Sequence, residues 1–246
     1  MLSVLKTLYR PVIRRVCYQI LMGRMIERER PERGRFLRND VNHILKETWR
    51  EVDEILPSAQ LERLPTLGNR MNVFFAVFTV AFYHALLGEG VEKQYSVELF
   101  ADIGWKLYSK LLAFPRLVAR LYSRDPNKQM GVILGMLGIY PFSAPGKPGY
   151  EVKAWLKPGC ICIDYLHCPP YSFVRQYVEQ NGDRGELALF RKSWCWYDWA
   201  FAYAIVDGGY KKLGHYERTH TLSSGDDVCD MRWYGRVPQG EHFEAQ

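Results

Sequence analysis

Hydrophobic residues recur at three- and four-residue steps through most of the first 125 positions, which is the pattern of helices that bury one side. The first such stretch covers residues 5–21, with Lys6, Arg10 and Arg14 on the opposite side. Further helical patterns cover residues 36–55, 69–88, 94–113 and 115–123, and Pro and Gly residues separate them. The first half of the chain is therefore predicted to be helical.

The pattern changes after SAPGKPG (143–149), which holds two Pro and two Gly in seven residues. Two strand-like runs surround Pro158-Gly159, and a second pair surrounds Ser224-Gly225. Between these hairpins we expect one helix from Pro169 to about 181 and another from about 185 to 205. The order hairpin, helix, helix, hairpin predicts an α+β fold: N-terminal helices followed by a four-stranded antiparallel sheet with helices packed on one face.

Two-residue turns would fix the register of both hairpins. The first turn sets Lys153 opposite Asp164 as an ion pair, and the second sets Glu217 opposite Arg232. Opposite charges thus face each other in both hairpins, which supports both registers.

The second register also sorts the polar residues of the last hairpin. His220 falls opposite Cys229 on one face, with Arg218 beside them, and Thr219 meets Asp230 on the other face. Only one of these faces can point at the helices.

A length of 246 residues fits one domain. We expect a basic helical extension over 1–38, a helical part over 39–148 that forms one compact domain with an α+β part over 149–237, and a tail over 238–246. The oligomeric state is left open, a homo-oligomer included.

Charge separates the extension from the rest of the chain. Residues 1–38 carry ten Lys and Arg against three Glu, a net +7, whereas the whole chain carries +6. The main body therefore lacks the positive charge that a nucleic-acid partner requires. Two interpretations of the N-terminal helix stand: it packs on the domain or a second subunit, or residues 1–26 contact an anionic membrane or act as a transit peptide.

Residues 71–87 are the best candidate for a membrane span. They are fewer than the roughly 20 apolar residues that a span needs, and they include Asn72, Thr79 and His84. A buried core helix is favoured. Six scattered Cys and the lack of a signal-peptide pattern favour reduced thiols and a cytoplasmic location.

Three cysteines and one aspartate are candidates for chemistry. Cys195 and Asp198 lie on the Trp-rich second helix, Cys168 follows a strand, and Cys229 lies in the last hairpin, so all are expected at the helix–sheet interface. Asp198 is either a general acid or base, or a structural carboxylate that caps a strand or pairs with Arg218. Each Cys is either a nucleophile or a small core residue.

Arg218 and His220 suggest four roles. Either could lower the pKa of a nucleophilic thiol, or the three thiols with His220 could hold zinc, although zinc ligands usually come in close pairs. Arg218 also suits a substrate carboxylate, or a structural pair with Asp198 or Asp226.

Three motifs carry a family resemblance: HCPP at 167–170, C-x-x-D at 195–198 and RTHTLSSGDDVCDM at 218–231. With this spacing the chain resembles the L-2-amino-thiazoline-4-carboxylic acid hydrolase family over roughly residues 70–235. Met231 stands where Phe is more usual.

The resemblance implies hydrolytic opening of a C–N bond in a small cyclic amidine or thiazoline that bears a carboxylate, or a related biosynthetic reaction. Such chemistry needs water activation or thiol attack, protonation of the leaving nitrogen, and a cation for the carboxylate. We assign catalysis to Cys168, Cys195, Asp198 and Cys229, and substrate binding to Arg218, His220, Thr221 and Asp230. No cofactor is required, with zinc as the alternative.

The element order is also similar to that of ligand-binding domains in nitric-oxide signalling, vinyl-reductase and vesicle-tethering proteins. This analogy raises a second hypothesis, a non-catalytic module that holds an apolar or tetrapyrrole ligand. An enzyme should gather Arg218, Asp198 and a Cys around one space, whereas a binding module should show an apolar tunnel.

Overall fold

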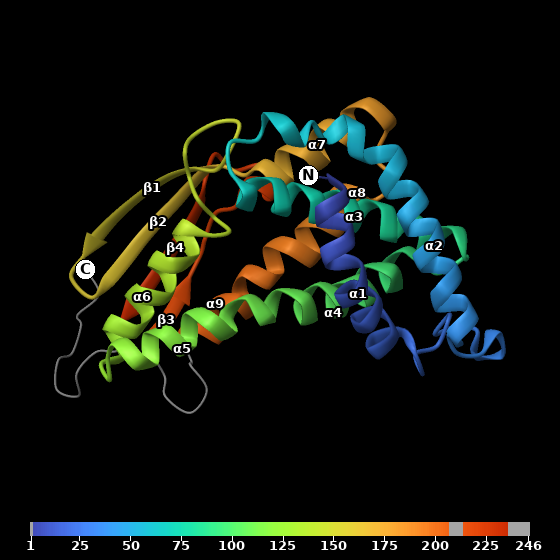
Figure 1. Ribbon diagram of the computed structural model, residues 1–246, viewed down its shortest axis with the longest axis horizontal. Helices are drawn as coiled ribbons and strands as arrows, with labels where there is room; N and C mark the ends of the chain where they lie inside the picture. Colours follow the sequence, from blue (N-terminus) through green and yellow to red (C-terminus); the bar gives the residue numbers. More distant parts are fainter. Residues whose placement is uncertain (1, 207–213, 236–246) are drawn as a thin grey trace.

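The computed structural model describes residues 2–206 and 214–235, without the side chains of 2–5, Tyr197, Asp198 and Phe201. The sheet lies at one end of the molecule and the helices α1 and α2 lie at the other (Figure 1). The α+β fold is confirmed. The helices are α1 (Leu2–Leu21), α2 (Arg38–Ile55), α3 (Leu67–Gly88), α4 (Lys93–Tyr108), α5 (Ala113–Tyr122), α6 (Pro126–Ile139), α7 (Pro169–Asn181), α8 (Glu186–Phe190) and α9 (Trp196–Val206). The strands are β1 (Glu151–Lys157), β2 (Cys160–His167), β3 (Gly214–Glu217) and β4 (Cys229–Gly235).

Helix α6 is the element that the periodicity missed. The sequence pattern indicates Pro126 only as a breaker, but this residue occupies the first turn of α6, where its missing N–H costs no hydrogen bond. Asp125 caps the helix by accepting a hydrogen bond from the backbone N–H of Asn127 at 2.8 Å. The three glycines of α6, at 131, 135 and 138, also lower its helix propensity.

Helix α3 is the centre of the helical half. It is the one described helix long and apolar enough to cross a membrane, and 89% of that stretch is buried within the protein. The rings of Phe74, Phe78 and Phe82 are all buried. The hydroxyl of Thr79 is satisfied locally, since it donates to the carbonyl of Phe75. These features agree with the predicted core helix.

Helix α1 packs on the domain, as one of the two interpretations expects. Its buried side, which includes Ile13, Val16 and Cys17, contacts α4 and α2. Lys6 forms an ion pair with Asp53 of α2. The apolar side of this helix is therefore largely used inside the protein.

The four strands form one antiparallel sheet in the order β1-β2-β4-β3. Both predicted registers are confirmed, with Lys153 opposite Asp164 and Glu217 opposite Arg232. The predicted ion pair is replaced, because the carboxylate of Asp164 binds the guanidinium of Arg232 on β4 at 2.7 Å. Helices α6 and α9 lie over one face of this sheet (Figure 1).

The last hairpin departs from the predicted two-residue turn. Pairing of β3 with β4 ends at Glu217, and residues 218–228 form a loop with a 3₁₀ turn at Leu222–Ser224. Asp230 accepts hydrogen bonds from the backbone N–H groups of Thr219 and His220, and Asp226 accepts one from that of Thr221. These carboxylates stabilise the loop in place of a longer ladder.

The predicted second helix is interrupted. Between α8 and α9 the residues Arg191–Cys195 form a π-helical turn. A π turn adds a residue to the helix and rotates the residues after it, so Cys195 and Asp198 do not lie on one continuous α-helix.

Candidate functional site

A cavity of about 610 Å³ lies between the sheet and the helices. Its sheet wall consists of side chains at alternate positions, which all point to the same face. Its other walls come from α6, the start of α7, Phe190, the π turn and the loop before β4. The sheet residues that line it are Val152, Ala154, Leu156, Ile161, Ile163, Tyr165, Cys229, Met231 and Trp233.

Helix α6 faces the cavity with glycines, which add no side-chain volume to it. Gly131, Gly135 and Gly138 line the cavity at four- and three-residue steps, so they share one side of the helix. A Cβ added at any of the three would meet no heavy atom within 4 Å. The helix thus presents bare backbone where a Leu would fill the space.

Three cysteines line this cavity together, as the sequence predicts. Cys168 precedes α7, Cys195 ends the π turn and Cys229 begins β4. Burial raises the pKa of Tyr171, and each of the three thiols adds to this effect when ionised. Tyr171 also lines the cavity, so its phenol lies within electrostatic reach of all three sulfur atoms.

Two of the sulfur atoms accept hydrogen bonds. The hydroxyl of Ser223 donates to Sγ of Cys195 at 3.0 Å. The backbone N–H of Leu222 donates to Sγ of Cys229 at 3.3 Å, and Oγ1 of Thr221 lies 3.3 Å from the same sulfur. These contacts hold the two thiols beside the loop before β4, at one end of the cavity.

Arg218 lines a second, smaller hollow of about 170 Å³ rather than the cavity. Arg191 and His220 line it as well, and Cys195 and Thr221 line both spaces. The guanidinium of Arg218 donates to the backbone carbonyl of Cys195 at 2.8 Å. Arg218 therefore contacts the end of the π turn and lines the smaller hollow, not the large cavity.

His220 of the loop between β3 and β4 forms a pair with Asp230 of β4. Nδ1 of His220 lies 3.1 Å from Oδ2 of Asp230, and this hydrogen bond raises the pKa of His220. Burial acts to raise the pKa of Asp230, but hydrogen bonds from Thr219 and His220 outweigh it and hold that pKa at about 2. Both residues stabilise the loop, and neither lines the main cavity.

Asp198 lies on α9, and its side chain is outside the described part of the structure. No three His, Cys, Asp or Glu side chains among the described residues come together as metal ligands. The zinc alternative thus finds no ligand set within residues 2–206 and 214–235. The sequence-based assignment also missed Tyr171, Ser223 and the glycines of α6, although the glycine spacing itself was visible in the sequence.

Comparison with protein families, curated proteins and solved structures finds no match to this chain.

Proposed function

We propose that the protein binds an uncharged, largely apolar small molecule in the cavity between the sheet and α6. The observation that carries this proposal is a cavity of about 610 Å³ with no charged side chain among the described residues that line it. Small-molecule sites commonly enclose about 300–1,000 Å³ within mostly apolar walls. A charged ligand would lose its hydration there without gaining a partner.

One polar group on the ligand is expected. Trp233 lines the cavity, and its indole N–H is buried without a partner among the described residues. The hydroxyl groups of Thr221 and Ser223 stand at the thiol end. A carbonyl, ether or hydroxyl oxygen would suit the indole N–H. A tetrapyrrole with ionised carboxylates fits less well, because no described cation lines the space.

Substitutions on α6 that place a larger side chain in the cavity test this proposal. Titration of the purified protein with the uncharged fluorophore Nile red should show saturable binding, and Gly131→Leu and Gly135→Leu should each weaken it at least about tenfold, which is about 1.4 kcal/mol. Gly88→Leu is the matched control, since a Cβ at Gly88 also meets open space but lies at the end of α3. The proposal is contradicted if the parent protein does not bind Nile red. It is also contradicted if neither Gly131→Leu nor Gly135→Leu weakens the binding.

The smaller hollow favours a second candidate, the hydrolase that the family resemblance implies. There a thiol residue, Cys195, adjoins the cations Arg191 and Arg218 in a space of about 170 Å³, the scale of a small carboxylate. In this function the thiol of Cys195 would add to the amidine carbon, and the ring C–N bond would break as the leaving nitrogen takes up a proton. Water would then attack the same carbon and release the thiol, while the cations would hold the carboxylate. The hydrolase reaction would therefore take place in the smaller hollow and not in the apolar cavity.

A panel of cyclic amidines and thiazoline carboxylates tests the hydrolase. Turnover should be lost in Cys195→Ser and should fall in Arg218→Ala more than in Arg218→Lys, with exposed Arg63→Ala as control. No turnover by the parent protein, or full turnover by Cys195→Ser, rules out this candidate and leaves the binding function.

A further inference from the structure

Helix α5 exposes its large apolar residues and buries its small ones. Phe114, Leu117 and Leu121 are 66%, 56% and 80% exposed, and their three- and four-residue steps place them on one side of the helix. The opposite side buries Pro115 and Ala119. A surface helix normally turns its larger apolar side inward, so this apolar side is suited to a partner outside the fold.

Positive charge accompanies the apolar side. Residues 106–128 hold six Lys and Arg against one acid, Asp125, a net +5 on a chain of net +6. None of these six cations forms an ion pair with an acid of the described residues. By contrast, three N-terminal cations are paired, since Lys6, Arg24 and Arg28 bind acids of α2 and α4.

Two arginines of α5 have no acidic partner among the described residues. Arg116 and Arg120 are four residues apart and so are neighbours on the helix surface. Nε of Arg116 is buried and has no hydrogen-bond partner among the described residues. Burial lowers the pKa of Arg116, and the charge of Arg120 lowers it further. An anion bound beside this pair would relieve both effects.

We propose that α5 binds the surface of an anionic membrane. Phe114, Leu117 and Leu121 enter the boundary between headgroups and acyl chains, while Arg116 and Arg120 bind lipid phosphates. A short helix with an apolar side and flanking cations has the composition of an interfacial helix. Cations close to an anionic leaflet add to the apolar contribution.

Charge distinguishes the membrane from other partners. A symmetric contact with a second copy of the chain would bring the same cations together, which is unfavourable. A nucleic acid would neutralise the arginines but leave the apolar side in water. This location also differs from the one that the sequence suggests, because the apolar side of α1 is largely buried against α2 and α4.

Vesicle sedimentation of the full chain tests the proposal. The protein should pellet with phosphatidylcholine vesicles that contain phosphatidylserine and should pellet less with phosphatidylcholine alone. The double substitution Arg116→Gln/Arg120→Gln should reduce the partition coefficient about 30-fold, and Leu117→Gln/Leu121→Gln at least about tenfold. Added salt should weaken binding of the parent more than that of the arginine variant.

Leu8→Gln on α1 is the matched control, since Leu8 is likewise an exposed leucine of a basic helix. It should leave partition unchanged, and circular dichroism should show that every variant stays folded. Absence of vesicle binding overturns the proposal. Vesicle binding that Leu8→Gln weakens and the α5 variants leave unchanged also overturns it. A third contrary result is a dimer, seen by light scattering, that Leu117→Gln/Leu121→Gln dissociates while the protein binds no vesicles.

Discussion

The two halves of the molecule fill their interiors differently. In the helical half, α3 supplies large rings such as Phe78 and Phe82, and its neighbours pack on them from several sides. In the sheet half, α6 supplies glycines at the corresponding inward positions, and a cavity of about 610 Å³ remains. Both halves are apolar inside, so side-chain volume rather than hydrophobicity decides which is solid and which is hollow.

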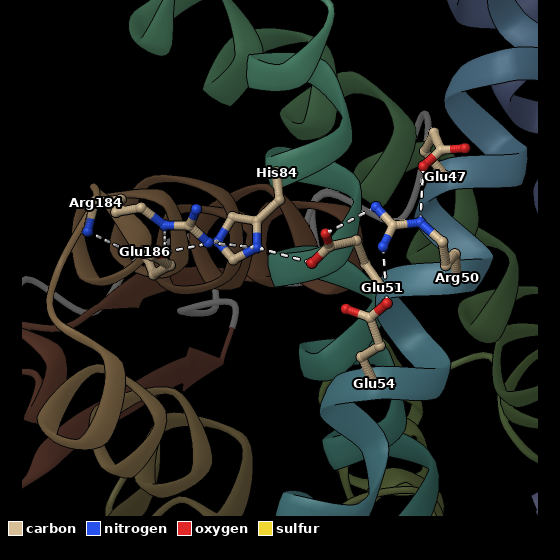
Figure 2. A network of polar contacts seen from close by, with 7 residues as sticks. All are labelled: Glu47, Arg50, Glu51, Glu54, His84, Arg184 and Glu186. Carbon is tan, nitrogen blue, oxygen red and sulfur yellow. Dashed lines mark hydrogen bonds and ion pairs between the residues drawn. The ribbon is translucent and has the colours of Figure 1, made fainter.

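One buried polar site in each half gives a further comparison. In the helical half, His84 of α3 lies between two carboxylates, with Nε2 2.7 Å from Glu186 and Nδ1 3.3 Å from Glu51 (Figure 2). Arg50 extends this network along α2 to Glu51 and Glu54. In the sheet half, the Trp233 indole N–H is buried without a described partner. A fully satisfied network stabilises a fixed structure, whereas an unsatisfied donor beside a cavity suits a ligand.

The largest expected difference in stability is between two variants, each with one leucine of one half replaced by alanine. Leu86→Ala on α3 removes a fully buried side chain and should reduce the free energy of unfolding by about 3–5 kcal/mol. Leu134→Ala on α6 enlarges a space that already exists, so the cost should be only about 1–2 kcal/mol. Urea unfolding of both variants measures the two values. Equal losses would mean that the cavity is filled in solution.

A second effect concerns the acid stability of the helical half. Burial acts to raise the pKa of Glu186, but hydrogen bonds from His84 and from backbone N–H groups outweigh it and hold the pKa at about 2, against an ordinary 4.5. A carboxyl whose pKa is lower in the folded protein stabilises it above the ordinary pKa, and this contribution is lost as the pH falls from 4.5 to 2.

We expect a loss on the order of 3 kcal/mol across that range. In Glu186→Gln the slope of unfolding free energy against pH should flatten, although Asp230, with its own pKa of about 2, keeps part of it. Urea unfolding at a series of pH values measures both slopes. A variant with the slope of the parent would show that Glu186 is not responsible.

Glycine substitutions in the two halves should have opposite signs, and Gly131→Ala should have the smallest effect of all. Gly131→Ala adds a methyl group to open space within a helix and should raise the free energy of unfolding by about 0.5–1 kcal/mol. Gly185→Ala should lower it by about 1–3 kcal/mol, because Gly185 has φ +124° and its Cβ would lie 2.5 Å from the Tyr83 hydroxyl. Thermal unfolding of both variants gives the sign of each change in stability. Destabilisation by Gly131→Ala would count against an open space beside α6.

The sequence predicted the elements with strong periodicity and the strands with clear turns. Helix α3 follows from its long apolar run, and the register of β3 with β4 follows from Glu217 and Arg232. Helix α6 was missed because its glycines weaken local propensity, and only packing against α5 and the sheet stabilises it. The π turn at 191–195 likewise has no local signal in the sequence.

The candidate site was predicted in part. Cys168, Cys195 and Cys229 were expected at one helix–sheet interface, and the three do line one cavity. Arg218 was expected in the same space, but it lines the smaller hollow and donates to the carbonyl of Cys195. The direction of that side chain depends on where β3 ends, and the carboxylates of Asp226 and Asp230 shape the loop between β3 and β4.

The sequence by itself determined most of the helices and strands, the register within each hairpin and which residues are apolar enough to be inside. These properties depend on neighbours a few residues apart. Only the tertiary structure decided that α6 faces the sheet with its glycines, that α5 exposes its leucines and that three distant thiols share one space. Those outcomes depend on the volumes of side chains that meet across the fold, which no local pattern specifies.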